Sequence, residues 1–150
     1  MRTLATIGYE QTSLDDFIGA LTGAGVQQII DVREVPISRK RGFSKRALAD
    51  ALGSAGIGYA HIKALGGPKP GRDAARRGDL VTFRRIYNTH LASDEAKAAL
   101  DQAGAMAASM PSCLMCFERD YVDCHRQIVA AALAERDGFQ VRHLKALSGH

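Results

Sequence analysis

CLMCFERDYVDCHR, residues 113–126, joins two segments of opposite character. Its first five residues form an apolar run typical of a buried strand, and its last three begin a segment with helical spacing. The stretch contains Cys116, Glu118 and Cys124, and His125 and Arg126 follow Cys124 directly. A buried strand that leads straight into a helix is half of a βαβ unit, which predicts a parallel sheet with polar groups at its carboxyl edge.

The rest of the chain repeats this alternation of strand and helix. Apolar patterns predict four further strands, over residues 4–7, 28–32, 59–62 and 140–144. Helical spacing separates them, with N-caps predicted at Ser13, Ser44, Asp79, Ser93 and Asp123. This order predicts an α/β fold of three layers, α/β/α and Rossmann-like, with a mostly parallel sheet of about five strands.

Residues 1–150 are expected to form a single domain, with a core over about 4–144 and a short C-terminal tail. The longest stretch without regular spacing is 63–78, which contains Gly66, Gly67 and Pro70. Its glycines and prolines predict a long loop, and loops of this length are often functional.

Composition places the chain among globular proteins, with 46% hydrophobic and 24% charged residues. No apolar run is long enough to span a membrane, and the N-terminus lacks the apolar region of a signal peptide, so a cytoplasmic protein is expected. Three cysteines are an odd number, and a disulfide framework is therefore not expected. A domain of this size is also of a kind that can form a homodimer.

Basic residues are concentrated in two segments, although the formal net charge is only +4. Residues 33–46 carry six basic side chains and one acidic one, and residues 63–77 carry five and one. Such clusters fit an anionic small molecule or nucleic acid as a partner. They are also compatible with solvated loops that have no ligand.

The polar residues that follow the predicted strands fall at one edge of the sheet, because parallel strands end on the same side. Five are candidate catalytic groups: Glu118 as general acid or base, His61 or His125 in proton transfer, and Cys124 or Cys116 as nucleophile. Cys124 is favoured over Cys116, because a helix N-terminus and neighbouring cationic groups lower a thiol pKa. Five are candidate anion-binding groups: Arg33, Arg39, Arg126, Gly66 and Gly67.

These residues also have structural interpretations. Cys116 is compatible with a small core residue, His61 with a hydrogen-bonded half-buried side chain, and Glu118 with a salt-bridge partner. Asp31 is placed to fix Arg33 by hydrogen bonding.

The spacing Cys-x2-Cys-x7-Cys-His suggests zinc, but no metal and no cofactor is predicted. Cys113 and Cys116 lie three residues apart on a strand, where they point to opposite faces of the sheet. A site that joins Cys116 to Glu118, Cys124 and His125 is geometrically feasible but matches no familiar ligand spacing.

The motifs closely resemble one family, the bacterial and archaeal proteins grouped as domain of unknown function 488. The resemblance covers about residues 4–144 and rests on Thr6-Ile7-Gly8, Asp31-Val32-Arg33, Pro36, Ser38-Arg39, Phe43, Tyr59, His61, Leu65-Gly66-Gly67, Cys116-Phe117-Glu118 and Cys124-His125-Arg126. Tyr9 stands where the family often has histidine, which implies that no imidazole is essential there. The resemblance supports the fold and the location of the site, and it implies no reaction.

A looser likeness is to rhodanese-type sulfurtransferases and cysteine phosphatases, through Asp31-Val32-Arg33 and the strand that ends near Cys116. Those enzymes bind their anion in a tight loop with an arginine shortly after the cysteine. Neither Cys116 nor Cys124 is followed by an arginine at the corresponding positions.

Three functions remain open. The first is an enzyme that acts on an anionic substrate, a nucleotide, nucleic acid or phosphorylated small molecule, at the carboxyl edge of the sheet. The second is a non-catalytic module that binds nucleic acid or a nucleotide through the basic segments, although the low aromatic content (6%, no Trp) argues against extensive stacking on single strands. The third is a rhodanese-like thiol or sulfur-transfer protein.

Overall fold

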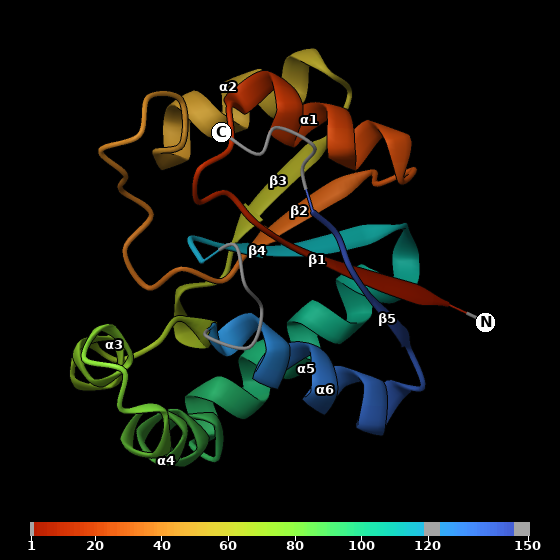
Figure 1. The fold of residues 1–150 in the computed structure, drawn as a ribbon. Coiled ribbons are helices and arrows are strands. Elements are labelled where there is room, and N and C mark those ends of the chain that lie inside the picture. Colours follow the sequence, from red (N-terminus) through yellow and green to blue (C-terminus); the bar gives the residue numbers. More distant parts are fainter. Residues whose placement is uncertain (1, 119–123, 146–150) are drawn as a thin grey trace.

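The computed structural model describes residues 2–118 and 124–145. Within these residues the centre of the fold is a parallel sheet (Figure 1) whose strands are β1 (Thr3–Gly8), β2 (Gln28–Asp31), β3 (Gly58–His61), β4 (Ser112–Cys116) and β5 (Gln140–His143). The strand order is β3-β2-β4-β1-β5, so β4 is paired on both sides.

Helices cover both faces of the sheet (Figure 1), and their bounds are α1 (Leu14–Gly23), α2 (Lys45–Ser54), α3 (Lys69–Arg76), α4 (Leu80–Leu91), α5 (Asp94–Ser109) and α6 (His125–Asp137). The first two helices lie on one face, where Phe17 and Leu52 belong to one hydrophobic core. The other four lie on the opposite face, where Tyr87 and Val129 belong to a second core. The predicted three-layer α/β/α fold with a five-stranded parallel sheet is therefore confirmed.

The connections identify where a ligand site is expected. The helix after β1 lies on one face of the sheet, and the helix after β4 lies on the other (Figure 1). These two strands are neighbours, so their carboxyl ends form the topological switch point at which open α/β sheets bind ligands.

The prediction that residues 63–78 form a loop is wrong, because this segment contains a short 3-10 helix (Lys63–Leu65) and α3. Pro70 lies in the first turn of α3, where a backbone N–H has no acceptor within the helix. Gly71 is buried in α3, and a Cβ atom there would lie 3.3 Å from Cγ2 of Ile86 on α4. The glycine therefore allows the two helices to pack closely.

Three of the predicted N-caps are confirmed, since the side chains of Ser13, Asp79 and Ser93 each accept a backbone N–H of the first turn. Ser44 occupies the N-cap of α2, but its hydroxyl exchanges hydrogen bonds with the backbone of Ser38 instead. The N-cap of α6 is Cys124, and Asp123 lies outside the described residues, as do positions 146–150 of the predicted tail. No helix in the described ranges is long and apolar enough to cross a bilayer.

Candidate functional site

A cavity of about 730 Å³ opens at the carboxyl edge of the sheet, and we call it the edge pocket. Its lining comes from the segments after β1, β2 and β4, from α3 and α4, and from the start of α6. The lining residues include Tyr9, Glu10, Arg33, Glu34, Val35, Ile37, Arg39, Lys40, Arg72, Arg76, Cys116, Phe117, Glu118 and His125. The edge pocket thus lies at the switch point between β1 and β4.

Basic side chains form the rim of the edge pocket. Arg72 is paired with Glu34 at 2.8 Å, and Arg76 is paired with the exposed Asp73 at 3.4 Å. Among the residues that the structure describes, Arg39 and Lys40 have no ion-pair partner. These two side chains are the rim cations with charge available to a ligand.

Apolar side chains share the rim. Ile37 is 74% exposed, Val35 is 46% exposed and Phe117 is 45% exposed, and all three line the edge pocket. The rings of Tyr9 and Phe117 pack edge to face, with their centroids 5.4 Å apart. The rim therefore offers both positive charge and apolar surface to the same ligand.

Arg33 lies in the pocket wall, but its guanidinium is already bonded inside the protein. Its Nε and Nη2 atoms donate to the carboxylate of Asp31, which confirms the predicted hydrogen bonding. Nη1 donates to the Tyr9 hydroxyl and the Phe43 carbonyl. Burial lowers the pKa of Arg33, but the hydrogen bonds and charge of Asp31 outweigh it and raise the pKa overall. Arg33 therefore orders the wall and has little donor capacity left for an anion.

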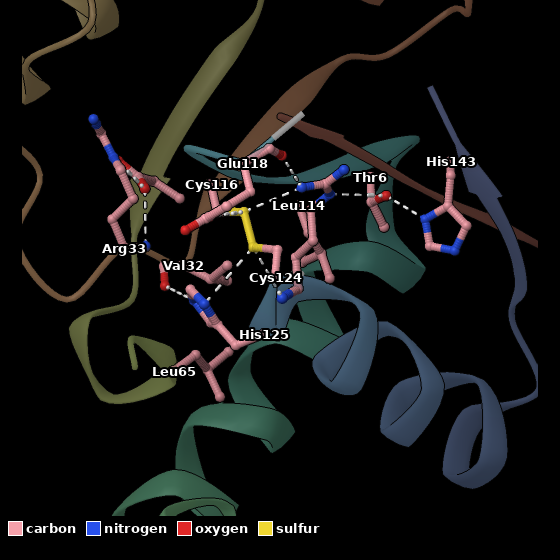
Figure 2. Close-up of a disulfide and its surroundings, with 12 residues drawn as sticks. Thr6, Val32, Arg33, Leu65, Leu114, Cys116, Glu118, Cys124, His125 and His143 are labelled. Atoms are coloured by element: carbon pink, nitrogen blue, oxygen red, sulfur yellow. Dashed lines mark hydrogen bonds and ion pairs between the residues drawn. A yellow bond between two sulfur atoms is a disulfide. The ribbon is translucent and has the colours of Figure 1, made fainter. Parts of the chain in front are cut away.

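Cys116 and Cys124 are joined by a disulfide at the floor of the edge pocket (Figure 2), so the expectation drawn from the odd cysteine count is wrong. The bond forms because the end of β4 meets the N-terminus of α6. The number of cysteines in a sequence does not reveal such a contact. Cys113 is a free, buried cysteine and belongs to the core on the opposite face from Cys116, as strand periodicity predicts. In this form neither Cys116 nor Cys124 is a nucleophilic thiol.

Polar groups surround the disulfide (Figure 2). Nη1 of Arg126 lies 3.2 Å from Sγ of Cys116, and Oε2 of Glu118 lies 3.5 Å from the same sulfur. The backbone N–H of Arg126 donates to Sγ of Cys124 at 3.5 Å. Arg126 therefore contacts both sulfurs, one through its side chain and the other through its backbone N–H.

Arg126 is fully buried and does not line the edge pocket. Its Nε donates to the hydroxyl of Thr6 at 3.2 Å, and its Nη1 donates to the backbone carbonyl of Glu118. The sequence proposed it as an anion-binding residue. The structure places it behind the floor, against Cys116.

His125 has one defined tautomer. Its Nε2 lies 2.6 Å from the carbonyl oxygen of Val32 (Figure 2), and because a carbonyl only accepts, this nitrogen carries the proton. Nδ1 is then unprotonated, and it lies 3.8 Å from Sγ of Cys124. Burial lowers the pKa of His125 to about 4, so the imidazole is neutral at physiological pH.

Glu118 is the carboxylate of the floor. Burial raises its pKa above the ordinary value, while its own backbone N–H and the charge of Arg126 act in the opposite direction. The side chain lines the edge pocket beside Cys116 and His125. The floor therefore combines a carboxyl group, a neutral imidazole and sulfur within reach of a bound molecule.

The remaining candidates lie outside the lining. The ring of His61 donates from Nε2 to the backbone carbonyl of Arg33 at 2.6 Å, so this histidine ties β3 to the pocket wall. Gly66 packs against the backbone of Glu34. A Cβ atom added at Gly66 would lie 2.3 Å from the Cα atom of Glu34. A Cβ atom on Gly67 would lie 3.5 Å from the side chain of Arg72. Gly66 therefore allows close packing behind the rim, whereas a Cβ atom at Gly67 would make an ordinary contact.

Sequence reasoning did not single out several lining residues. Lys40, Arg72 and Arg76 belong to the two basic segments, and that clustering is the signal that could have found them. Glu34 was overlooked because it is the single acidic residue of the first basic segment. Its partner Arg72 lies 38 positions later in the sequence. Long-range pairing of this kind has no local signature.

Comparison with known proteins gives one match. A family model described as "Domain of unknown function DUF488" matches residues 13–133. No curated protein and no solved structure matches the chain.

Proposed function

Because the chain belongs to the DUF488 family, whose description assigns no reaction, we propose its function from the edge pocket: it is an enzyme that acts on an anionic substrate. The substrate class is a nucleotide, a nucleic acid or a phosphorylated small molecule. The family match confirms the resemblance of the motifs. The support for the proposed chemistry comes from the site alone.

The observation that carries the proposal is the pair of rim cations, Arg39 and Lys40, which face the pocket without an ion pair in the described part of the chain. Phosphate oxygens accept hydrogen bonds from guanidinium and ammonium groups, and these bonds are stronger than neutral ones. Arg76 lines the same cavity, and its ion-pair partner among the described residues is the carboxylate of Asp73. The rim of the edge pocket therefore offers unpaired positive charge to an anion.

The exposed apolar side chains argue for a nucleotide over a bare inorganic ion. Phe117 presents an aromatic ring at the rim, and Ile37 adds aliphatic surface. Bases stack on aromatic rings, and such stacking is worth about 1–3 kcal/mol per base. A ligand with phosphates against Arg39 and Lys40 and a base against Phe117 uses both kinds of surface.

The floor supplies the reactive groups. Glu118 and His125 line the pocket beneath the rim cations, and one carboxyl group and one neutral imidazole are suited to proton transfer or to ligation. His61 is not assigned a catalytic role, because its ring is bonded to the Arg33 carbonyl outside the lining.

Calorimetric titration with a nucleoside triphosphate, pyrophosphate and a nucleoside tests the proposal. The double variant Arg39→Ala/Lys40→Ala is expected to weaken triphosphate and pyrophosphate binding at least tenfold, because each lost phosphate contact costs about 1.5–3 kcal/mol. Phe117→Ala is expected to weaken the triphosphate and leave pyrophosphate unchanged. Arg41→Ala is the matched control, since Arg41 is exposed, basic and outside the lining. No binding of either phosphate ligand, or equal losses in Arg41→Ala, would contradict the proposal.

Two alternatives predict different results. A non-catalytic nucleic-acid or nucleotide-binding module shows the same salt-sensitive binding with no turnover of any bound nucleotide or oligonucleotide. A rhodanese-like sulfur-transfer protein is favoured by one observation, the presence of Cys116 in the pocket lining with the sulfur of Cys124 bonded to it. A persulfide detected by mass spectrometry on reduced protein after incubation with a sulfur donor, and lost in Cys116→Ser, would support that alternative.

A further inference from the structure

We propose that, once the Cys116–Cys124 bond is reduced, one zinc ion binds at the floor of the edge pocket to Cys116, Glu118, Cys124 and His125. The site goes beyond the proposed function, because it requires no anionic substrate.

Three of the four donors already lie close together, and the fourth, His125, lies beside Cys124. Ligand atoms of Cys116, Glu118 and Cys124 all lie within 4.8 Å of one another. Zinc–sulfur bonds of about 2.3 Å and zinc–oxygen or zinc–nitrogen bonds of about 2.0–2.1 Å make the sulfur-to-oxygen or sulfur-to-nitrogen edge of a tetrahedron about 3.6 Å. The Cys116 Sγ to Glu118 Oε2 distance is 3.5 Å, and the Cys124 Sγ to His125 Nδ1 distance is 3.8 Å.

The two sulfurs are the atoms that must move. In a tetrahedral site they separate from bonding distance to about 3.8 Å. The Cα atoms of the two cysteines are 7.3 Å apart, so rotation of the side chains is enough to make this space.

The hydrogen bonds around the donor residues are those typical of residues that bind a metal. A histidine that binds a metal through one nitrogen almost always donates its other N–H to a carbonyl or carboxylate, and Nε2 of His125 donates to the Val32 carbonyl. That bond leaves Nδ1 unprotonated on the side of Cys124. The thiolates are supported as well, since Arg126 donates to Cys124 Sγ from its backbone and lies 3.2 Å from Cys116 Sγ with its side chain.

Charge also favours a divalent ion. Two thiolates and the Glu118 carboxylate bring three negative charges together, and the guanidinium of Arg126 supplies one positive charge beside Cys116. A divalent cation makes this buried group of charges neutral. Thiolate and imidazole ligands select zinc over magnesium or calcium, which prefer oxygen. Cys116, Glu118 and His125 line the edge pocket, which gives the ion a path from solvent.

Loading the site requires reduction first. Two molecules of a small thiol supply two electrons and two protons to the disulfide and are themselves oxidised to a disulfide, which leaves Cys116 and Cys124 as thiols. Zinc then displaces the two thiol protons, which pass to solvent. Reoxidation of the pair by a disulfide or a peroxide would release the ion.

Metal binding by the reduced full chain tests the inference. Anaerobic protein is titrated with Co²⁺, and the expected result is one ion per chain with thiolate-to-cobalt charge-transfer absorption. X-ray absorption of the zinc-loaded protein is expected to give two sulfur neighbours at about 2.3 Å and two nitrogen or oxygen neighbours at about 2.0–2.1 Å. The disulfide form is expected to bind no zinc.

Variants assign the ligands. Cys116→Ser and Cys124→Ser are expected to lower zinc affinity more than about 100-fold, because loss of a ligand exceeds the 10–100-fold effect of outer residues. Cys113→Ser is the matched control and is expected to bind normally, since this thiol lies in the opposite core. Reduced wild-type protein that binds no zinc, or a zinc site without sulfur neighbours, would overturn the inference even if a cysteine variant fails to fold. Nucleotide binding by metal-free protein separates this outcome from failure of the proposed function.

Discussion

The guanidinium of Arg126 and the sulfur of Cys116 lie 3.2 Å apart in the interior of the protein. Arg126 comes from the first turn of α6, and Cys116 is the last residue of β4. The same guanidinium donates to the backbone carbonyl of Glu118 and to the hydroxyl of Thr6. One buried cation therefore joins the floor of the edge pocket to the central strands.

Replacement of this cation is expected to be costly. Arg126→Met leaves the Glu118 carbonyl and the Thr6 hydroxyl without this buried donor, and it should lower the free energy of unfolding by about 2–4 kcal/mol. In reduced protein it should also raise the thiol pKa of Cys116, because the adjacent positive charge is lost. Urea denaturation measures the first effect, and the pH dependence of alkylation measures the second. Arg142→Met, at a residue outside the edge pocket whose side chain is exposed, is the control.

His125 predicts a pH dependence of stability in the disulfide form. Its pKa is about 4 in the folded protein and about 6.5 when unfolded, so the unfolded state binds the proton first as the pH falls. The contribution of neutral His125 to the free energy of unfolding is therefore complete above about pH 6.5. It declines between about pH 6.5 and pH 4, by up to about 3 kcal/mol. Urea denaturation at a series of pH values, compared with His125→Gln, should show a smaller decline in the variant. Equal slopes in the two proteins would contradict this role.

Asp31 is expected to be essential to the pocket wall. It accepts from the Arg33 guanidinium and from the hydroxyl of Tyr59, whose pKa is raised by burial and by that carboxylate. Asp31→Asn removes the charge that balances buried Arg33 and should cost about 3–5 kcal/mol of unfolding free energy. Asp73→Asn, at an exposed ion pair, should change it by less than about 1 kcal/mol. Thermal or urea denaturation of both variants distinguishes them.

Gly66 predicts a steric effect behind the rim. A Cβ atom there would lie 2.3 Å from the backbone nitrogen and Cα of Glu34, so Gly66→Ala must displace the segment that holds Glu34. We expect a loss of at least about 2 kcal/mol and weaker triphosphate binding. Gly53→Ala is the control, because Gly53 lies in α2 with no atom within 4 Å, and alanine should stabilise that helix by up to about 1 kcal/mol. Similar losses in both variants would argue against a specific clash.

Local patterns in the sequence were enough to predict the sheet and most helices. Ser13, Asp79 and Ser93 combine an N-cap residue with helical spacing, and both signals act over a few neighbouring positions. The α3 segment was mispredicted because Pro70 and Gly71 oppose a helix in isolation. Pro70 is tolerated in the first turn, and Gly71 allows a close contact with Ile86, which lies on another helix.

The position of the edge pocket follows from topology, which brings the carboxyl ends of the strands together. The roles of individual residues depend on contacts that no local pattern contains. Arg33 resembles an anion ligand in the sequence, yet Asp31, Tyr9 and Phe43 occupy its donors. Cys116 and Cys124 meet because β4 ends against the start of α6, across eight positions of chain.

The central position of β4 has a consequence for how this pocket can vary. Cys116 ends a strand that is hydrogen-bonded on both sides, whereas Ile37, Arg39 and Lys40 belong to a connection between β2 and α2. Amide hydrogens of β4 should therefore exchange slowest and those of the connection fastest. A mutation in the connection can alter which molecule is admitted without disturbing the groups beneath it, so recognition and reactivity can evolve separately in this domain.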